Sequence, residues 1–347
     1  MTLALPPTVA ARLKRGVVIP AHPLALNARR RLDERHQRAL TRYYLAAGAG
    51  GLAVGVHTTQ FEIHDPKVGL LRPVLELAAE TARETRRQVP ILVAGVIGTT
   101  RQAVREARLA RDLGYHLALV SLAAFPRAGD AALVEHMQRV GQVLPVMGFY
   151  LQQAVGGRDL SYDFWRRALE IDTMVAIKVA PFDRYRTIEV VRAVADSGRH
   201  DVALYTGNDD HIVLDLVAPP VGHRTRFVGG LLGQWAMWTS RAPRLLTRSH
   251  SATDRGGSVP RPLLVTAAQL TDANGAIFDA AHGFAGCLSG IHEVLRRQGL
   301  LQGTWCLDPD QSLSRGQESE IDRVLGAYPR LQDDDFVRRN LDKWLSQ

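Results

Sequence analysis

A lysine inside an apolar run is the residue of this sequence with the clearest chemical potential. Only four of the 43 basic residues are lysine, and Lys178 alone lies in an unbroken apolar segment, TMVAIKVAP at 173–181. An unpaired charge is costly to bury, and lysine, unlike arginine, can lose its proton. A buried amine with a lowered pKa can form an imine with a ketone. The structural alternative is a lysine that reaches solvent at the strand end or pairs with a carboxylate.

Metal chemistry is the main mechanistic competitor of an imine. The twelve histidines include no His-x-Glu-x-x-His or similar ligand pair. His57 and His64 lie too far apart, on a strand end and a loop, to form a persuasive pair. We therefore expect no metal and no metal-dependent aldolase.

The composition is that of an ordinary globular protein. The 347 residues are 46% hydrophobic and 22% charged, enough for two domains or for one large barrel with additions. The apolar stretches are shorter than the ~20 residues of a membrane helix, and the N-terminus lacks the charge order of a signal peptide. Cys287 and Cys306 match no metal or redox spacing. These features predict a cytoplasmic protein without a membrane segment.

The formal net charge of +8 indicates anionic partners only weakly. No basic run with interleaved aromatic residues is present, so we expect no nucleic-acid partner. Arg241, Arg244 and Arg248 would suit an anion site, but a solvated helix face is the simpler interpretation.

Eight short apolar segments, each followed by an amphipathic stretch, recur in the first 235 residues. Asp33 and Ser161 are typical helix starts, and Gly48 and Gly114 typical helix ends. The predicted strands are residues 17–24, 50–59, 91–98, 116–122, 146–152, 174–181, 202–208 and 226–233. Eight such units predict a (β/α)8 TIM barrel, whose usual length is ~250 residues. A doubly wound sheet would need a Gly-rich phosphate turn after the first strand, and the sequence has none there.

The alternation ends after residue 234. Residues 241–262 are polar and basic, with two glycines and three prolines, and predict a loop. Later stretches have helical patterns. The sequence thus predicts an α/β protein with the barrel at residues 1–235 and an extended C-terminal helical region at residues 236–347.

The active site of such a barrel lies at the carboxyl ends of its strands. Because side chains alternate between the two faces of a strand, Lys178 shares one side with Ala176 and Ala180, which leave it room to face the barrel axis. The other polar or flexible residues near strand ends are His57, Thr58, Thr59, Tyr150, Gly207, Gly229 and Gly230.

Taken together, these segments resemble the dihydrodipicolinate synthase / N-acetylneuraminate lyase family of class I aldolases. HTTQF at 57–61 is similar to the signature of that family's second strand, and Tyr150 in GFYLQQ to its fifth-strand tyrosine. Lys178 in AIKVA matches the imine-forming lysine, 28 residues after the tyrosine, and TGNDD at 206–210 resembles the seventh-strand motif. The resemblance covers roughly residues 16–301.

The resemblance implies specific roles for these residues. Lys178 would form a Schiff base with pyruvate or another 2-keto acid, and Tyr150 would pass protons to and from the substrate. Thr58 and Thr59 would bind the substrate carboxylate. Positions near Gly207 and Val228 would bound the pocket.

The resemblance also implies that no cofactor is needed beyond the covalent imine. A small-molecule keto acid is the expected partner, and a homotetramer or homodimer the expected assembly.

Several positions depart from the family pattern. His57 replaces a glycine beside the threonine pair, and Phe125 stands where the synthases have a second aromatic hydroxyl. The synthases' carboxylate-binding arginine has no counterpart at its spacing, although Arg158 lies three residues later. His57 is either a substitute general acid or base, since imidazole titrates near neutrality, or a polar wall of the pocket.

Three functional hypotheses follow. The first is a Schiff-base lyase, either an aldolase or a hydro-lyase, that acts on a 2-keto acid. The second is a paralogue that binds keto acids without turnover. The third is a barrel that binds a phosphorylated substrate at Gly229 and Gly230 and forms no imine.

Overall fold

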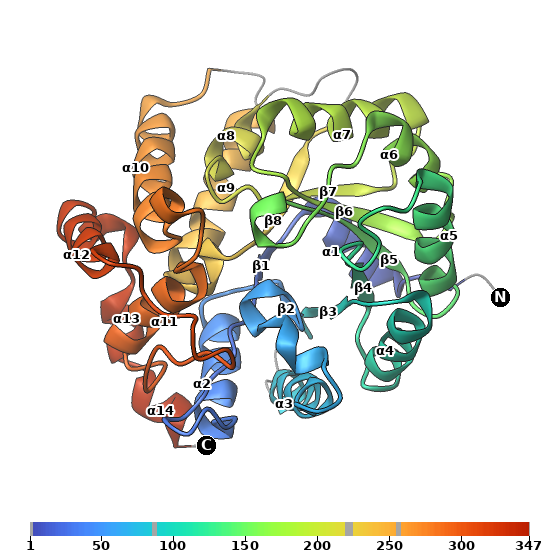
Figure 1. Cartoon of the computed structure of the whole chain (residues 1–347). Helices are drawn as coiled ribbons and strands as arrows, with labels where there is room; N and C mark the ends of the chain where they lie inside the picture. Colours follow the sequence, from blue (N-terminus) through green and yellow to red (C-terminus); the bar gives the residue numbers. More distant parts are fainter. Residues whose placement is uncertain (1–2, 85–88, 219–224, 255–257, 347) are drawn as a thin grey trace.

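Eight parallel strands form a barrel surrounded by helices (Figure 1). The computed structural model describes residues 3–84, 89–218, 225–254 and 258–346. The strands are β1 (Val18–Pro20), β2 (Gly51–Val54), β3 (Ile91–Val96), β4 (Leu117–Val120), β5 (Val146–Leu151), β6 (Met174–Ala180), β7 (Ala203–Thr206) and β8 (Phe227–Leu232).

The hydrogen-bonded strand order β1-β8-β7-β6-β5-β4-β3-β2 runs round the barrel. A parallel bridge between Ala21 and Ala53 joins the two ends of this order, and the His22 amide donates to the Ala53 carbonyl over 2.8 Å. The predicted (β/α)8 barrel is therefore confirmed.

Helices lie between the strands and after them. Those within the barrel sequence are α1 (Pro7–Arg15), α2 (Glu34–Ala46), α3 (Leu71–Glu84), α4 (Thr100–Asp112), α5 (Asp130–Gly141), α6 (Tyr162–Ala168), α7 (Arg184–Ser197) and α8 (Ile212–Val217). Those after β8 are α9 (Ala242–Asp254), α10 (Arg261–Ile277), α11 (Cys287–Arg297), α12 (Gln317–Ala327), α13 (Asp334–Arg338) and α14 (Leu341–Leu345).

The predicted helix signals function as expected. Asp33 caps α2 by accepting a hydrogen bond from the amide of His36, and Ser161 caps α6 by accepting from Phe164. Gly48, after α2, has a φ of 91°, a left-handed conformation that glycine adopts without steric cost.

The prediction of a loop at 241–262 was wrong, because α9 occupies most of that range. Its polar surface carries an apolar stripe, with Leu245, Leu246 and Ala252 buried. The helix contacts α8 and β1, as the last helix of a barrel does. The boundary predicted at residue 235 therefore precedes the last barrel helix, and the division into two domains stays a prediction.

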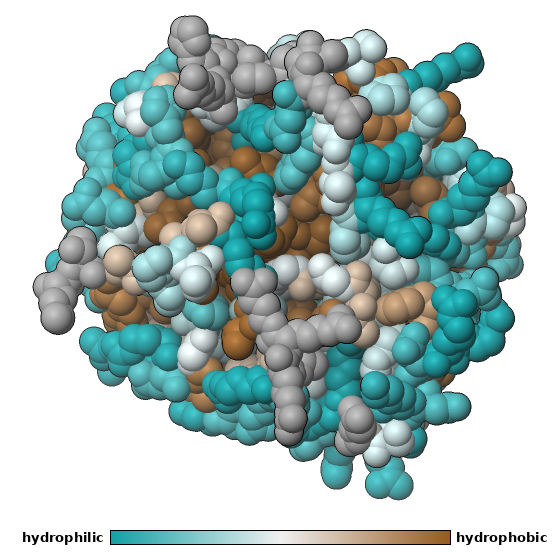
Figure 2. Space-filling view, turned by 180° about the vertical axis from the view of Figure 1, so that it is seen from behind, coloured by the Kyte–Doolittle hydropathy of each residue, from teal (hydrophilic) through white to brown (hydrophobic). Residues whose placement is uncertain are grey.

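The C-terminal helices gather on one side of the barrel (Figure 1), where α10 contacts α8 and α14 contacts α2. Their buried side chains belong to the same apolar core as the barrel's outer layer. No helix in the described part of the chain is long and apolar enough to cross a membrane. Figure 2 shows a face on which hydrophilic side chains are spread widely, with apolar ones between them.

Two apolar layers follow from the alternation of side chains along each strand. On β6, Ala176 and Ala180 belong to the cluster inside the barrel, whereas Ile177 and Val179 pack outward against the helices. Lys178 therefore points inward, as its position in the strand predicts.

Candidate active site

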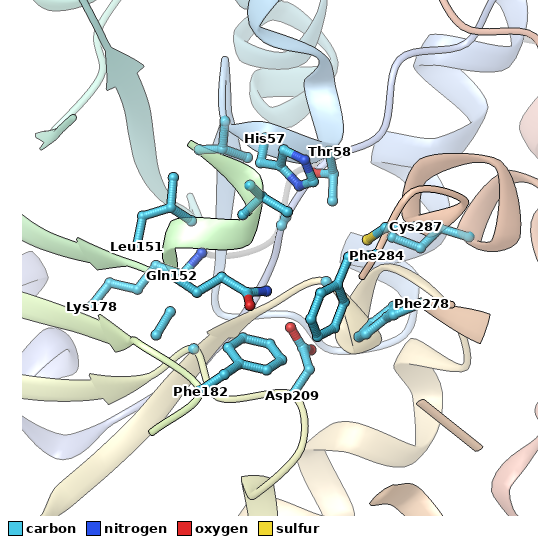
Figure 3. A pocket seen from close by; sticks show the side chains of 17 residues that line it. His57, Thr58, Leu151, Gln152, Lys178, Phe182, Asp209, Phe278, Phe284 and Cys287 are labelled. Atoms are coloured by element: carbon cyan, nitrogen blue, oxygen red, sulfur yellow. The ribbon is translucent and has the colours of Figure 1, made fainter. Parts of the chain in front are cut away.

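A small cavity of about 50 Å³ lies at the carboxyl ends of the strands (Figure 3). Lys178, Gly207 and Asp209 reach it from β6 and from the segment after β7, and His57 and Thr58 from the segment after β2. Its other lining residues are Ala21, Val56, Leu151, Gln152, Val155, Ala180, Phe182, Gly233, Phe278, Phe284, Cys287 and Ile291.

The Lys178 side chain is confined on two sides. Its Nζ lies 4.5 Å from the ring centroid of Phe149. Its alkyl chain packs against Gly207, which has no side chain to obstruct it. A Cβ at Gly207 would lie 2.6 Å from Cε of Lys178 and 2.8 Å from Cβ of Ala180. The glycine therefore makes the space that the lysine chain occupies.

The electrostatic setting of Lys178 increases the fraction of its amine that is unprotonated near neutral pH. Only 8% of the residue is exposed, and burial lowers the pKa of its amine to about 8, although Asp209 opposes the shift. None of the ion pairs formed among the described residues includes Lys178. The amine is neither turned into bulk water nor locked against a carboxylate.

Asp209 is the second charged side chain of the cavity. Its Oδ1 accepts a hydrogen bond from the Gln234 amide over 2.8 Å. Burial raises the pKa of this carboxyl to about 7, against the hydrogen bond and the attraction of Lys178. Asp209 lies within TGNDD, where no sequence signal set it apart as a site residue.

His57 lies in the cavity wall and carries no charge near neutral pH. Burial, reinforced by the positive charge of Lys178, lowers the pKa of its imidazole to about 4. The protonated form needed for a general acid is therefore scarce at pH 7. A neutral imidazole in the cavity wall favours the interpretation of His57 as a polar wall of the pocket.

The threonine pair divides into one lining residue and one structural residue. Both lie in the short 3-10 helix His57–Thr59, but only Thr58 lines the cavity. The Thr59 hydroxyl donates to the His22 carbonyl over 2.7 Å and accepts from the Gly55 amide over 3.0 Å. Thr59 thus holds the turn that presents Thr58, and the expected contact between Thr59 and substrate has no support.

Tyr150 does not face the cavity, contrary to the expectation. It belongs to the outer core, with its ring 5.9 Å from that of Trp165, and its hydroxyl accepts from the Leu160 amide over 3.2 Å. The residue of β5 opposite Lys178 is Phe149.

The cause is a shift of register between β5 and β6. Val146 pairs with Met174, but Met147 pairs with Ala176, so the strand β6 gains one residue at this irregularity. Adjacent residues of a strand point to opposite faces. The spacing of 28 residues from Tyr150 to Lys178 therefore no longer places the two side chains on one face.

Three other expectations also fall outside the cavity. Phe125 packs against His136 with ring centroids 4.7 Å apart. Arg158 donates to the carbonyls of Phe125 and Ala128 and so is engaged with backbone. Val228 lies at the opposite end of the barrel, where its carbonyl accepts from His250 over 2.8 Å.

Aromatic residues that no local motif indicated close the cavity. Phe182 follows β6, and Phe278 and Phe284 come from the segment between α10 and α11. The rings of Phe182 and Phe284 meet edge to face, with centroids 5.6 Å apart. The C-terminal helices therefore complete the site rather than only covering the barrel.

The donor set does not suggest a metal centre. Among the described residues, no three His, Cys, Asp or Glu side chains are grouped closely enough to hold a metal ion.

The glycines proposed for a phosphate site leave no space for one. A Cβ at Gly229 would lie 2.7 Å from the Tyr205 ring, and a Cβ at Gly230 would lie 2.8 Å from the Trp235 ring.

Comparison with known proteins decides the family. A sequence model of the dihydrodipicolinate synthetase family matches residues 14–223. The chain belongs to this family. A curated relative, 4-hydroxy-tetrahydrodipicolinate synthase of Legionella pneumophila, is 23% identical over 185 residues. That match covers 51% of this chain and 59% of the relative, less than two thirds of its length.

Solved structures of the family have the same fold. Dihydrodipicolinate synthase from Oceanobacillus iheyensis superimposes with a TM-score of 0.75 at 19% identity, over 93% of this chain and 99% of that one. N-acetylneuraminate lyase from Fusobacterium nucleatum, solved in complex with pyruvate, gives a TM-score of 0.70 at 17% identity, over 91% and 98%. At these identities the likeness establishes the barrel with its C-terminal helices.

Proposed function

We propose that this protein is a Schiff-base lyase, an aldolase or hydro-lyase, that acts on a 2-keto acid such as pyruvate through an imine on Lys178. One observation carries the proposal. The amine of Lys178 is buried at the carboxyl end of a family barrel, beside a cavity, with a lowered pKa and without an ion pair among the described residues.

The chemistry follows from that amine. Its lone pair attacks the keto carbon, and loss of water gives a protonated imine that draws electrons from the adjacent carbon. A C–C bond to that carbon can then break with its electron pair held as an enamine, as in an aldolase. In a hydro-lyase, loss of a proton from that carbon gives the enamine, which then expels a protonated hydroxyl of the next carbon as water. The Thr58 hydroxyl, whose contact with the His22 carbonyl is long at 3.4 Å, is suited to donate a hydrogen bond to the carboxylate of the keto acid at the cavity wall.

A second candidate is a paralogue that binds keto acids without turnover. The observation in its favour is the absence of a tyrosine hydroxyl where the resemblance expected one, since Phe149 lies opposite Lys178 and Tyr150 points outward. Such a protein would form the imine and stop there.

Borohydride trapping tests the imine. The protein is incubated with pyruvate, reduced with sodium borohydride and mapped by mass spectrometry, and we expect a reduced pyruvyl adduct on Lys178. Lys178→Arg should abolish the adduct, whereas Lys67→Arg, a change at an exposed residue, should leave it intact. Failure of a library of 2-keto acids to give any adduct would overturn both candidates.

Turnover separates the two candidates. The trapped keto acids are assayed for cleavage or hydration products and for condensation with a panel of aldehydes. Product formation that Lys178→Arg abolishes supports the lyase, and a stable imine without product across the panel supports the binding paralogue.

The remaining expectations belong to this proposal as well. We propose a cytoplasmic homodimer or homotetramer with a small-molecule substrate and no other cofactor than the covalent imine. Sedimentation velocity measures the assembly, and a monomer at micromolar concentration would contradict that part.

A further inference from the structure

A lyase of this kind must move protons at several substrate atoms, among them the keto oxygen and the adjacent carbon. The predicted tyrosine is not in place to do so. Besides Lys178, the cavity side chains with exchangeable protons are His57, Thr58, Gln152, Asp209 and Cys287. Hydroxyl and amide groups are poor acids and bases at neutral pH. Burial lowers the pKa of His57 to about 4 and raises that of the Cys287 thiol, which leaves Asp209.

Asp209 is held by hydrogen bonds and lines the same cavity as the reacting amine. It lies two residues after Gly207, the residue that Lys178 packs against. Its Oδ1 accepts from the Gln234 amide over 2.8 Å, and its carbonyl accepts from Nδ2 of Asn274 over 2.6 Å. Figure 3 shows its carboxylate directed into the pocket that it lines together with Phe182 and Phe284.

Burial of the Asp209 carboxylate costs free energy unless an interaction in the folded protein compensates for it. Asp209 is 8% exposed and forms no ion pair with a described residue closer than 4.0 Å, and a buried carboxylate without a partner is unfavourable. The titratable groups facing it are Lys178 on β6, Asp210 on the same turn and Cys287 at the start of α11. Of these, only Lys178 can supply a compensating positive charge.

We infer that Asp209 is the general acid and base of this site, a role that rests on the proposed imine chemistry. It acts on the substrate oxygen during imine formation and on the adjacent carbon afterwards. The proton passes between this carboxyl and the atoms of the forming imine.

The steps balance with this one pair. Lys178 forms the N–C bond while protonated Asp209 gives its proton to the carbonyl oxygen, and the carboxylate then takes a proton from the new ammonium nitrogen. Asp209 returns that proton to the hydroxyl, the C–O bond breaks, and water leaves a protonated imine opposite a carboxylate. The carboxylate next removes a proton from the adjacent carbon, and the C–H electrons form the enamine while the imine nitrogen accepts the displaced pair.

Hydrogen exchange at pyruvate tests the inference without knowledge of the second substrate. In D₂O the enamine step replaces the methyl protons of pyruvate by deuterium, which proton NMR follows. We expect Asp209→Asn to accumulate the borohydride-trapped adduct on long incubation but to exchange methyl protons about 10²- to 10⁴-fold more slowly than the unmodified protein. Asp112→Asn, a neutralisation of an exposed carboxylate at the end of α4, should exchange at the unmodified rate.

The outcomes are distinct. Exchange by Asp209→Asn within about threefold of the unmodified protein overturns the inference, and so does an unmodified protein that forms the adduct but does not exchange. An unmodified protein without adduct instead overturns the proposed function. If circular dichroism shows that Asp209→Asn does not fold, Asp209→Glu replaces it. We expect this longer carboxylate to form the adduct and exchange at least about tenfold more slowly, and unchanged exchange would refute the role.

Discussion

Replacing Gly207 by alanine tests whether the lysine position depends on the missing side chain at the end of β7. A Cβ there would lie 2.6 Å from Cε of Lys178 and 2.8 Å from Cβ of Ala180, whereas ordinary contacts begin at 3.4 Å. The flexible lysine chain can withdraw, but Ala180 is fixed in β6. Relief of the first contact alone requires a displacement of about 0.8 Å at the carbon next to the amine.

The displacement should affect both reactivity and stability. A misplacement of about 1 Å can slow a reaction on the order of 10²-fold, so we expect the initial rate of borohydride-trapped adduct formation to fall by about that factor. Overpacking should destabilise the fold by about 1–3 kcal/mol. Rapid-quench trapping with pyruvate measures the first effect and urea unfolding the second.

Gly275→Ala is the matched control. Gly275 lies within α10, and a Cβ there meets no atom within 4 Å. Alanine in a helix interior is favoured over glycine by about 0.5–1 kcal/mol, so this variant should gain stability and trap pyruvate normally. If Gly207→Ala traps at the unmodified rate, the confinement of Lys178 is not what positions its amine.

Two further predictions concern the proton state of the amine and the outward tyrosine. With the pKa of Lys178 lowered from 10.5 to about 8 and that of Asp209 raised to about 7, the free amine and the protonated carboxyl coexist most often near pH 7.5. The initial trapping rate should therefore rise about sixfold from pH 6 to pH 7.5 and fall back by pH 9; a tenfold rise per pH unit continuing past pH 9.5 would indicate an ordinary lysine. Tyr150→Phe should leave the trapping rate and the rate of methyl exchange within about threefold of the unmodified protein. It should lower the free energy of unfolding by about 1 kcal/mol, because the Leu160 amide loses its acceptor. A 10²-fold loss of exchange with unchanged stability would restore Tyr150 to the mechanism.

The barrel could be predicted from the sequence because its signals are local and repeated. Each buried parallel strand reads as an apolar run, and each following helix has a cap and an apolar face. Lys178 and Gly207 were predicted for the same reason. A charge within an apolar run is visible without a partner, and position within a strand decides the face it takes.

The part of the site that depends on register could not be predicted. Tyr150 and Phe149 are neighbours, so the offset of one residue in the pairing of β5 with β6 decides which of them faces Lys178. No residue type in GFYLQQ marks the irregularity between Val146 and Met147. The motif spacing predicted the family's tyrosine role for Tyr150. The register shift instead directs the side chain of Tyr150 into the outer core.

The aromatic closure of the cavity is a long-range feature. Phe278 and Phe284 are about 100 residues from Lys178 in the sequence and reach the cavity only because α10 and α11 pack beside α8 and the barrel end. Their positions follow from tertiary packing, which an apolar residue in a C-terminal helical region does not reveal.

The charge balance of the cavity ties these features together. Among the described residues that line it, Lys178 and Asp209 are the only lysine, arginine, aspartate or glutamate side chains, so no described arginine there neutralises the carboxylate of a keto acid. A bound keto acid would add one negative charge, which favours the protonated form of Asp209 and the protonated form of the imine. Conversion of the amine into an iminium places a fixed positive charge next to the substrate carboxylate. Asp209 can then be protonated or ionised while the net charge of the cavity stays within one unit of zero. The same lack of a second cation disfavours substrates with a second acidic group within the cavity, so chain-extended keto acids that carry a distal carboxylate should be trapped less readily than pyruvate.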